Sequence, residues 1–104
     1  MRRGTTPTNT FEVDRDLTEA RVYVTYSQMG KVVIEKTNED LTITADSIEC
    51  TLSQEDTLAL KDGIVEIQIR YITELGAADA SDIMRTTAER ILKDGVITYE
   101  ISEG

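Results

Sequence analysis

The stretch IECTLSQEDTLALKDGIVEIQI (residues 48–69) decides the fold that this sequence predicts. Residues 48–52 and 64–72 both alternate apolar and polar side chains, which is the pattern of a half-buried β-strand. The alternation stops between them, where Ser53 and Asp56 have the spacing of a capping box, with Asp in the place of the usual Glu or Gln. We therefore expect two strands joined by a short helix.

The same alternation continues toward the N-terminus. Residues 20–26 (ARVYVTY) and 31–37 (KVVIEKT) read as a hairpin whose turn contains Gly30. Shorter alternating runs occupy residues 10–14 and 41–45. Four or five short strands separated by polar turns are typical of an antiparallel sandwich or barrel.

The C-terminal third is less regular. Residues 73–81 contain a glycine and several small residues, and we expect a loop there. Residues 82–92 are ambiguous between helix and strand, and the paired threonines favour a strand over 82–90. Residues 96–102 are either a last short strand or a frayed tail.

The length and charge of the chain limit its organisation and its partners. With 104 residues it is expected to be one domain, a β-sandwich over residues 9–104 preceded by a flexible arm at residues 1–8. Its net charge of −9 repels phosphates, so we expect no nucleic-acid partner and no binding to anionic membranes. No apolar stretch follows the first arginines, so we expect no signal peptide and synthesis in the bacterial cytoplasm.

The sequence shows none of the residue patterns typical of common catalytic sites, although its 20 carboxylates do not exclude a glycosidase-like pair by count. Histidine is absent, and the six glycines are scattered instead of forming a phosphate-binding loop. The strand carboxylates lie in the solvent phase of their strands: Glu12, Glu35, Glu49 and Glu66. The single cysteine, Cys50, lies in the apolar phase and is expected to be a buried, inert thiol. We therefore expect no enzyme activity and no cofactor.

Calcium is the one metal that the acidic turns of the sequence suggest. Residues 14–16 (DRD) and 38–40 (NED), together with Asp79 and Asp82, offer oxygen ligands. None of these groups has the spacing of an EF-hand loop, and acidic turns are ordinary in an acidic protein. We therefore predict no metal site.

Four residues are candidates for contacts with partner proteins. Arg2 and Arg3 form a basic spot on an acidic chain, and Pro7 is the only proline of the arm that carries them. Such an arm is either a solvated terminus or a docking segment. Tyr23 is the clearest aromatic side chain in the outward phase of a predicted strand.

The order of these elements resembles a known group of proteins. The arm RRGTTPT, the hairpin VYVTYSQMGKVVIEK, the stretch LTITADSIECTLSQEDTLAL, the strand IVEIQIRYI and the closing RILKDGVI resemble small prophage-encoded proteins of gut Firmicutes. They are also similar to the immunoglobulin-like N-terminal domain of phage baseplate upper proteins. Those proteins continue into receptor-binding domains, whereas we expect this chain to be a lone domain, so the resemblance implies an assembly role instead of direct host binding.

We therefore predict an all-β, immunoglobulin-like antiparallel β-sandwich of about seven strands, with one short helical crossover near residues 54–60. The predicted core consists of Phe11, Val13, Val22, Val24, Tyr26, Val32, Ile34, Leu41, Ile43, Ile48, Cys50, Leu52, Leu58, Leu60, Val65, Ile67, Ile69 and Ile83. The resemblance implies a non-enzymatic phage or prophage structural protein, a baseplate or tail accessory piece. Its partners would be other phage structural proteins or further copies of itself, and its final location the virion. The alternative is a stand-alone binding module for a small ligand or carbohydrate.

Overall fold

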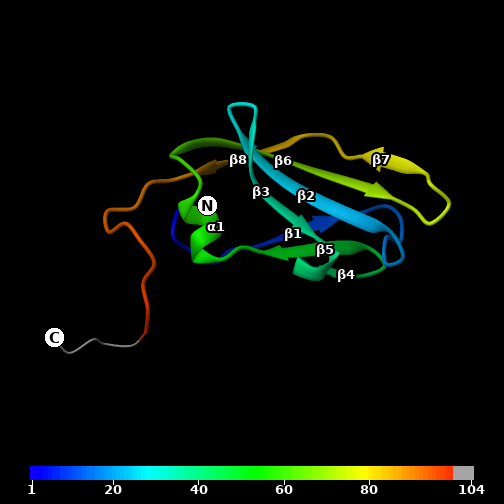
Figure 1. The fold of residues 1–104 in the computed structure, drawn as a ribbon, viewed down its shortest axis with the longest axis horizontal. Coiled ribbons are helices and arrows are strands. Elements are labelled where there is room, and N and C mark those ends of the chain that lie inside the picture. Colours follow the sequence, from blue (N-terminus) through cyan, green and yellow to red (C-terminus); the bar gives the residue numbers. More distant parts are fainter. Residues whose placement is uncertain (100–104) are drawn as a thin grey trace.

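A computed structural model of the chain describes residues 1–99, which form two antiparallel β-sheets stacked as layers (Figure 1). The smaller sheet has the strand order β1 (Thr8–Glu12), β5 (Ser47–Thr51), β4 (Leu41–Ile43). The larger sheet has the order β3 (Lys31–Thr37), β2 (Arg21–Gln28), β6 (Gly63–Ile72), β7 (Ala78–Ala80), and β8 (Met84–Ala88) also pairs with β6. The predicted all-β antiparallel sandwich is confirmed, with eight strands among the described residues where about seven were expected.

The short helix α1 (Gln54–Leu58) connects β5 of the smaller sheet to β6 of the larger one, as the sequence predicted. Its capping box is complete, because the Asp56 N–H donates to Ser53 Oγ (3.0 Å) and the Ser53 N–H donates to Asp56 Oδ2 (2.9 Å). The helix ends at Leu58, two residues earlier than expected. A second helical turn, η1 (Asn38–Asp40), joins β3 to β4.

The hairpin between β2 and β3 turns at Met29 and Gly30, whose φ angles are 50° and 76°. A two-residue turn with positive φ at both positions matches the right-handed twist of the flanking strands. The predicted hairpin is therefore confirmed.

A β-bulge in this hairpin corrects one predicted core residue. Tyr26 pairs with Ile34, but the next residue, Ser27, pairs with Val32, so Val33 is the extra residue in β3. The extra residue changes which side chains face the core. Val33 packs against the core in place of Val32, whose side chain is 62% exposed.

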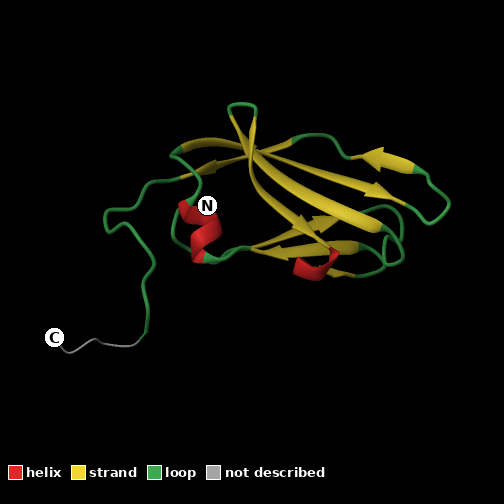
Figure 2. Cartoon of the chain, in the orientation of Figure 1, coloured by secondary structure: helices red, strands yellow, loops and turns green. Residues whose placement is uncertain are grey.

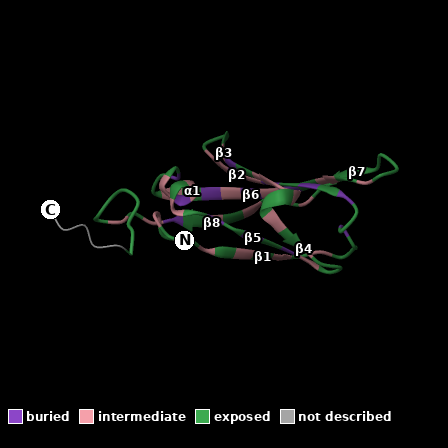
Figure 3. Cartoon of the chain, turned by 60° about the horizontal axis from the view of Figure 1, so that its bottom comes forward, coloured by how far each residue is buried: buried purple, intermediate pink, exposed green. Residues whose placement is uncertain are grey.

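The core lies between the two sheets, as the burial colours of Figure 3 show. The predicted core residues that are buried are Val22, Val24, Tyr26, Ile34, Ile48, Cys50, Leu52, Leu60, Val65, Ile67 and Ile69. Half-buried side chains that pack against them are Phe11, Val13, Leu41 and Ile43. Buried residues that the prediction missed are Leu17, Ala20, Thr57 and Ala88.

Two further core predictions are wrong. Leu58 is only half-buried and lies outside the core cluster, because Thr57 and Leu60 occupy the inward face of the turn at a spacing of three residues. Ile83 is 48% exposed, because it precedes β8 in the phase that faces solvent, opposite to Met84 and Ala88.

One edge of β6 is shared by β7 and β8, with a gap between them. Ser81 fills this gap: its N–H donates to the Ile69 carbonyl (2.8 Å), and its Oγ accepts from the Ile69 N–H (3.0 Å). The Gln68 side-chain amide donates to the Ser81 carbonyl (3.0 Å). The strand favoured over residues 82–90 is confirmed as β8, whereas β7 lies in a segment that was predicted to be a loop.

The chain before β1 lies against β8 and α1. The Arg3 N–H donates to the Glu89 carbonyl (3.0 Å), and the Glu89 N–H donates to the Met1 carbonyl (2.9 Å). Gly4 has a φ of 74°, and a Cβ there would lie 2.9 Å from the Ile91 side chain. β1 begins at Thr8, which is the last residue of the expected arm.

The chain after β8 leaves the sandwich as an irregular segment that reaches beyond α1 (Figure 2). Residues 96–99 form no strand. The rest of the possible last strand, residues 100–102, lies outside the described residues.

Candidate functional site

The two arginines of the predicted basic spot make different contacts. The Arg3 guanidinium donates from Nε to the Leu60 carbonyl (2.6 Å) and from Nη2 to the Leu58 carbonyl (2.8 Å). These are carbonyls that the end of a helix leaves without partners. Arg2 donates from Nη1 to the Arg90 carbonyl (3.1 Å) and keeps an exposed side chain. Arg3 thus has a structural role at the end of α1.

The other two predicted contact residues lie on different surfaces. The Pro7 carbonyl accepts from the Leu52 N–H (2.9 Å), which extends the pairing of β1 with β5 by one bond. Tyr23 is 36% exposed on β2 and borders a cavity of about 390 Å³ with Glu35 and Arg70. The structure therefore gathers Arg2, Arg3 and Pro7 on the segment before β1 and leaves Tyr23 apart from them.

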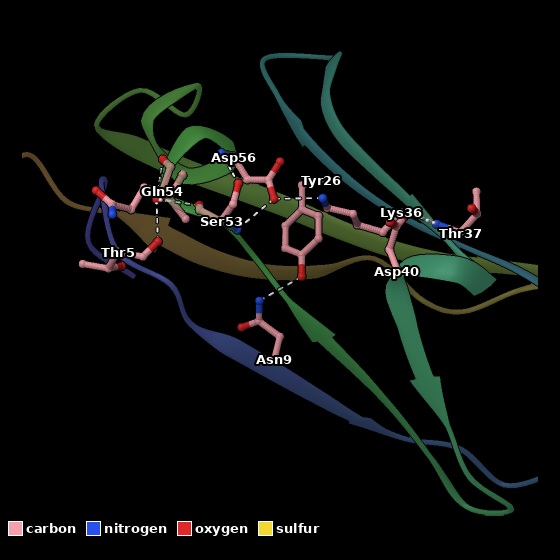
Figure 4. A network of polar contacts seen from close by, with 10 residues as sticks. Thr5, Asn9, Tyr26, Lys36, Thr37, Asp40, Ser53, Gln54 and Asp56 are labelled. Atoms are coloured by element: carbon pink, nitrogen blue, oxygen red, sulfur yellow. Dashed lines mark hydrogen bonds and ion pairs between the residues drawn. The ribbon is translucent and has the colours of Figure 1, made fainter. Parts of the chain in front are cut away.

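A network of polar side chains ties α1 to the segment before β1 and to β3 (Figure 4). Lys36 Nζ on β3 lies 2.9 Å from Asp56 Oδ2 on α1, and both side chains are about four-fifths buried. The fully buried Thr57 hydroxyl donates to the Thr5 carbonyl (2.8 Å). The network holds the crossover between the two sheets in one position.

Burial and hydrogen bonding act in opposite directions on the charged pair. Burial alone would raise the pKa of Asp56, but hydrogen bonds from Lys36 and Ser53 outweigh it and lower that pKa. The hydrogen bond to Asp56 raises the pKa of Lys36. The pair therefore stays ionised well beyond the neutral range.

The buried groups below this pair stay neutral. Burial raises the pKa of Tyr26, whose hydroxyl accepts a hydrogen bond from Asn9 Nδ2 (2.8 Å). Burial also raises the pKa of the Cys50 thiol, which has no exposed surface. A protonated, inaccessible thiol is a poor nucleophile. Tyr26 and Cys50 therefore contribute to the stability of the core and are not reactive groups.

A cavity lies away from α1, between β1 with the residues that follow it and the edge of β6 that carries β7 and β8. We call it the edge groove. Its volume is about 750 Å³. Its apolar lining consists of Phe11, Val13, Leu17, Ile69, Tyr71 and Met84. The groove therefore opens directly onto the side of the hydrophobic core.

Charged side chains border this apolar lining. The carboxylates that line the edge groove are Glu12, Asp14, Asp79 and Asp82. The one basic side chain, Arg15, places its guanidinium carbon 5.6 Å from the centre of the Tyr71 ring, at the distance of a cation–π contact. Arg15 Nε also lies 4.0 Å from Asp14 Oδ1. The border is predominantly negative.

Both walls of the edge groove are strand edges. β1 pairs only with β5 among the described strands, and β7 is the outermost strand on its side of the larger sheet. An edge strand presents main-chain N–H and C=O groups that can pair with another strand. The arrangement offers apolar lining and main-chain partners together, which is what an extended polypeptide requires.

Three of the acidic residues considered for calcium line this groove: Asp14, Asp79 and Asp82. They do not form a metal centre, because no three acidic or cysteine side chains within residues 1–99 are placed to hold an ion. In the same part of the chain, no helix has the length and apolar character needed to cross a membrane.

Comparison of the chain with protein-family models, with curated proteins and with solved structures found no match.

Sequence reasoning missed the edge groove because its residues come from separate segments. Phe11 and Val13 were expected to face the core. Leu17 and Arg15 lie in the connection between β1 and β2, where no periodicity marks them.

Proposed function

We propose that this chain is a non-enzymatic structural protein that binds other proteins through the edges of its sheets. The observation that carries the proposal is the edge groove, where two strand edges border an apolar lining. Strand addition at such an edge provides main-chain hydrogen bonds for affinity and side-chain pockets for specificity. No covalent chemistry is needed for this role.

The features of the rest of the molecule support an assembly role. The crossover α1 is held by the Lys36–Asp56 pair and by Arg3, so the sandwich is a rigid support for its own edges. Its net charge of −9 favours solubility of the protein before it binds its partners.

The class of partner that we propose is a set of phage or prophage structural proteins, with this chain as a baseplate or tail accessory protein. This assignment rests on the resemblance carried by residues 48–69 and by the hairpin before them. It remains a prediction, and the chain would be found in the virion after synthesis in the bacterial cytoplasm.

A binding module for a small ligand or carbohydrate is the second candidate. Tyr71 favours it, because its ring lines the edge groove and contacts Arg15. Aromatic rings and carboxylates are common in concave ligand sites. A rise in melting temperature with a sugar from a panel, lost in Tyr71→Ala, would favour this candidate over the first.

The proposal is tested by locating the protein in its own bacterium. Particles are released by inducing the prophage, separated on a density gradient and analysed by mass spectrometry. We expect peptides of this chain in the particle fraction, in a constant ratio to the other structural proteins. Their presence only in the soluble fraction would overturn the assembly role.

A further inference from the structure

The strand β1 turns the main-chain groups of two of its residues away from β5. The Pro7 carbonyl accepts from the residue after β5 (2.9 Å), and the Val13 N–H donates to the residue before β5 (2.9 Å). In an antiparallel pair, the residues that bond to the partner strand alternate with residues that do not. The continuous register of β1 with β5 therefore bonds the odd-numbered residues to β5. The N–H and C=O groups of Thr10 and Glu12 point to the open side of the strand.

This open side is a wall of the edge groove. The groove is lined by Thr10 and Glu12, whose side chains are exposed, and by Phe11 and Val13, whose side chains pack against the core. Because successive side chains of a strand point to opposite faces, a cavity lined by both faces lies along the edge of the strand. The main-chain groups of Thr10 and Glu12 are thus placed to pair with a further strand.

Two other strand edges offer fewer main-chain partners. On β7, the register turns the Ala80 N–H away from β6, and this N–H donates to the Asp79 carboxylate (2.8 Å). On β4, at the other edge of the smaller sheet, the Leu41 N–H donates to the Asn38 carbonyl of η1. The edge of β1 is therefore the more open one.

The apolar lining of the groove suits a segment with alternating side chains. A strand laid along β1 directs every second side chain toward the lining and the others toward solvent. The inward side chains would meet Phe11, Tyr71 and Met84, which are half-buried at the side of the core. Their further burial favours binding of apolar side chains at these inward positions.

The charges of the groove favour a cationic segment. The carboxylates of Glu12, Asp14, Asp79 and Asp82 line the groove, and Arg15 is the basic residue of the lining. The positive charge of Arg15 is partly offset, because its Nε lies 4.0 Å from Asp14 Oδ1. The net charge of −9 on the whole chain has the same sign as this border. Complementary charge promotes encounter with a cationic partner and disfavours an anionic one.

We infer that the edge groove binds an extended segment of a partner protein in which lysine or arginine alternates with apolar residues. The segment adds to β1 as a strand, with its apolar side chains on the lining and its cationic side chains near the carboxylates. The inference rests on the proposed function and names the chemistry of the partner at that site. The affinity falls as salt is added, because salt screens attraction between exposed charges.

The probes are synthetic peptides of about seven residues, within the usual length of a strand. In three of them, lysine alternates with valine, leucine or tyrosine. One comparison peptide has glutamate in place of lysine. Another keeps the lysines but is N-methylated throughout, so that it has no main-chain N–H donor. Binding to the isotope-labelled full chain is followed by NMR titration and by amide hydrogen exchange.

A charge variant tests whether binding is located at the groove. It removes three exposed carboxylates of the lining by Glu12→Gln, Asp79→Asn and Asp82→Asn. Its matched control removes three exposed carboxylates elsewhere on the chain, so that both variants have the same net charge: Glu39→Gln, Glu55→Gln and Asp62→Asn. Attraction to the chain as a whole would weaken equally in both variants.

A backbone variant tests whether binding uses the edge of β1. Thr10→Pro removes an N–H that points away from β5, and proline is tolerated in an edge strand at such a position. Thr10→Val keeps this N–H and is the matched control. Circular dichroism verifies that all four variants fold.

We expect at least one lysine peptide to bind and to slow amide exchange at Thr10 and Glu12. Exchange at Ile43, on the edge strand β4, should stay unchanged. The charge variant should lose about tenfold in affinity, from three exposed charge pairs. Thr10→Pro should also lose about tenfold, from one main-chain hydrogen bond. Both controls should bind as the natural chain does.

The inference is overturned if no lysine peptide binds, or if the glutamate or N-methylated peptide binds as tightly. Equal losses in the charge variant and its control, or equal affinities of Thr10→Pro and Thr10→Val, would overturn it as well. If the chain is then still found in the particle fraction, only the proposed partner chemistry is wrong and the proposed function stands. Specific peptide binding by a chain that is absent from particles would keep the site and remove the phage role.

Discussion

Replacement of Asp56 by alanine should destabilise this protein more than any other single change to a charged side chain on α1. The carboxylate accepts from Lys36 Nζ at 2.9 Å and from the Ser53 N–H at 2.9 Å, and only about a fifth of its surface is exposed. Removal leaves a largely buried ammonium group and a helix N-terminus without their acceptor. The crossover between the two sheets then loses its attachment to β3.

The magnitude follows from these two contacts. Loss of an acceptor for a charged, partly buried donor costs about 1.5 kcal/mol, and loss of the capping contact costs about 1 kcal/mol. Asp56→Ala should therefore lower the free energy of unfolding by about 2.5 kcal/mol, and the Tm by about 10 °C. Asp56→Asn keeps an acceptor for Ser53 and should cost about 1 kcal/mol.

The assay is urea denaturation followed by circular dichroism, on both Asp56 variants, on Lys36→Met and on the double variant. Asp62→Ala, at an exposed aspartate, is the control and should cost nothing measurable. The double-variant cycle isolates the energy of the ion pair. A coupling energy of zero, or Asp56→Ala as stable as the control, would refute the reasoning.

The pH dependence of the same pair provides an independent check. The pKa of Asp56 is lowered from 3.8, so its contribution is complete above 3.8 and is lost as pH falls through the folded value. The pKa of Lys36 is raised from 10.5, so its contribution is complete below 10.5 and is lost as pH rises through the folded value. The stability difference between the natural chain and Asp56→Asn should therefore be greatest between these limits.

Three further predictions concern other parts of the molecule. Ile67→Asp should unfold the domain, because Ile67 is 5% exposed and an unpaired buried charge costs more than a small domain's total stability; an unchanged Tm would show that the assigned face of β6 is wrong. Arg3→Met should lower the free energy of unfolding, measured by urea denaturation, by about 2 kcal/mol, since it leaves the Leu58 and Leu60 carbonyls without donors. A variant as stable as the natural chain would show that Arg3 has no structural role. Cys50 should react with a thiol reagent only after denaturant is added, because it has no exposed surface and a raised pKa; rapid reaction of the native protein would contradict its burial.

Local patterns in the sequence were sufficient for the longer strands and for the crossover, but not for the three-residue strand β7. The alternation in residues 64–72 identified β6 and its inward face, because side chains in a strand alternate with a period of two whatever the strand pairs with. Ser53 and Asp56 identified the start of α1, because a capping box needs only residues three apart. Both features depend on neighbours in the chain.

Features that depend on distant residues were decided only by the tertiary structure. Val32 faces solvent because a bulge opposite Tyr26 shifts the phase of β3, and a bulge is a property of two paired strands. Arg3 was expected at a basic spot but lies on the carbonyls that end α1, a partner more than fifty residues away in the sequence.

The edge groove is the clearest case of a feature that local sequence patterns prepare and the tertiary structure decides. The sequence of each segment predicted that it forms a strand and which of its side chains face the core, because both follow from local periodicity. The strand order β1-β5-β4 and the sharing of one edge of β6 by β7 and β8 follow from how the sheets stack and close. Only that stacking brings Phe11, Tyr71 and Met84 to one cavity between two free edges. The sequence by itself determined a β-sandwich with a helical crossover, and the tertiary structure decided which strand edges border a common groove.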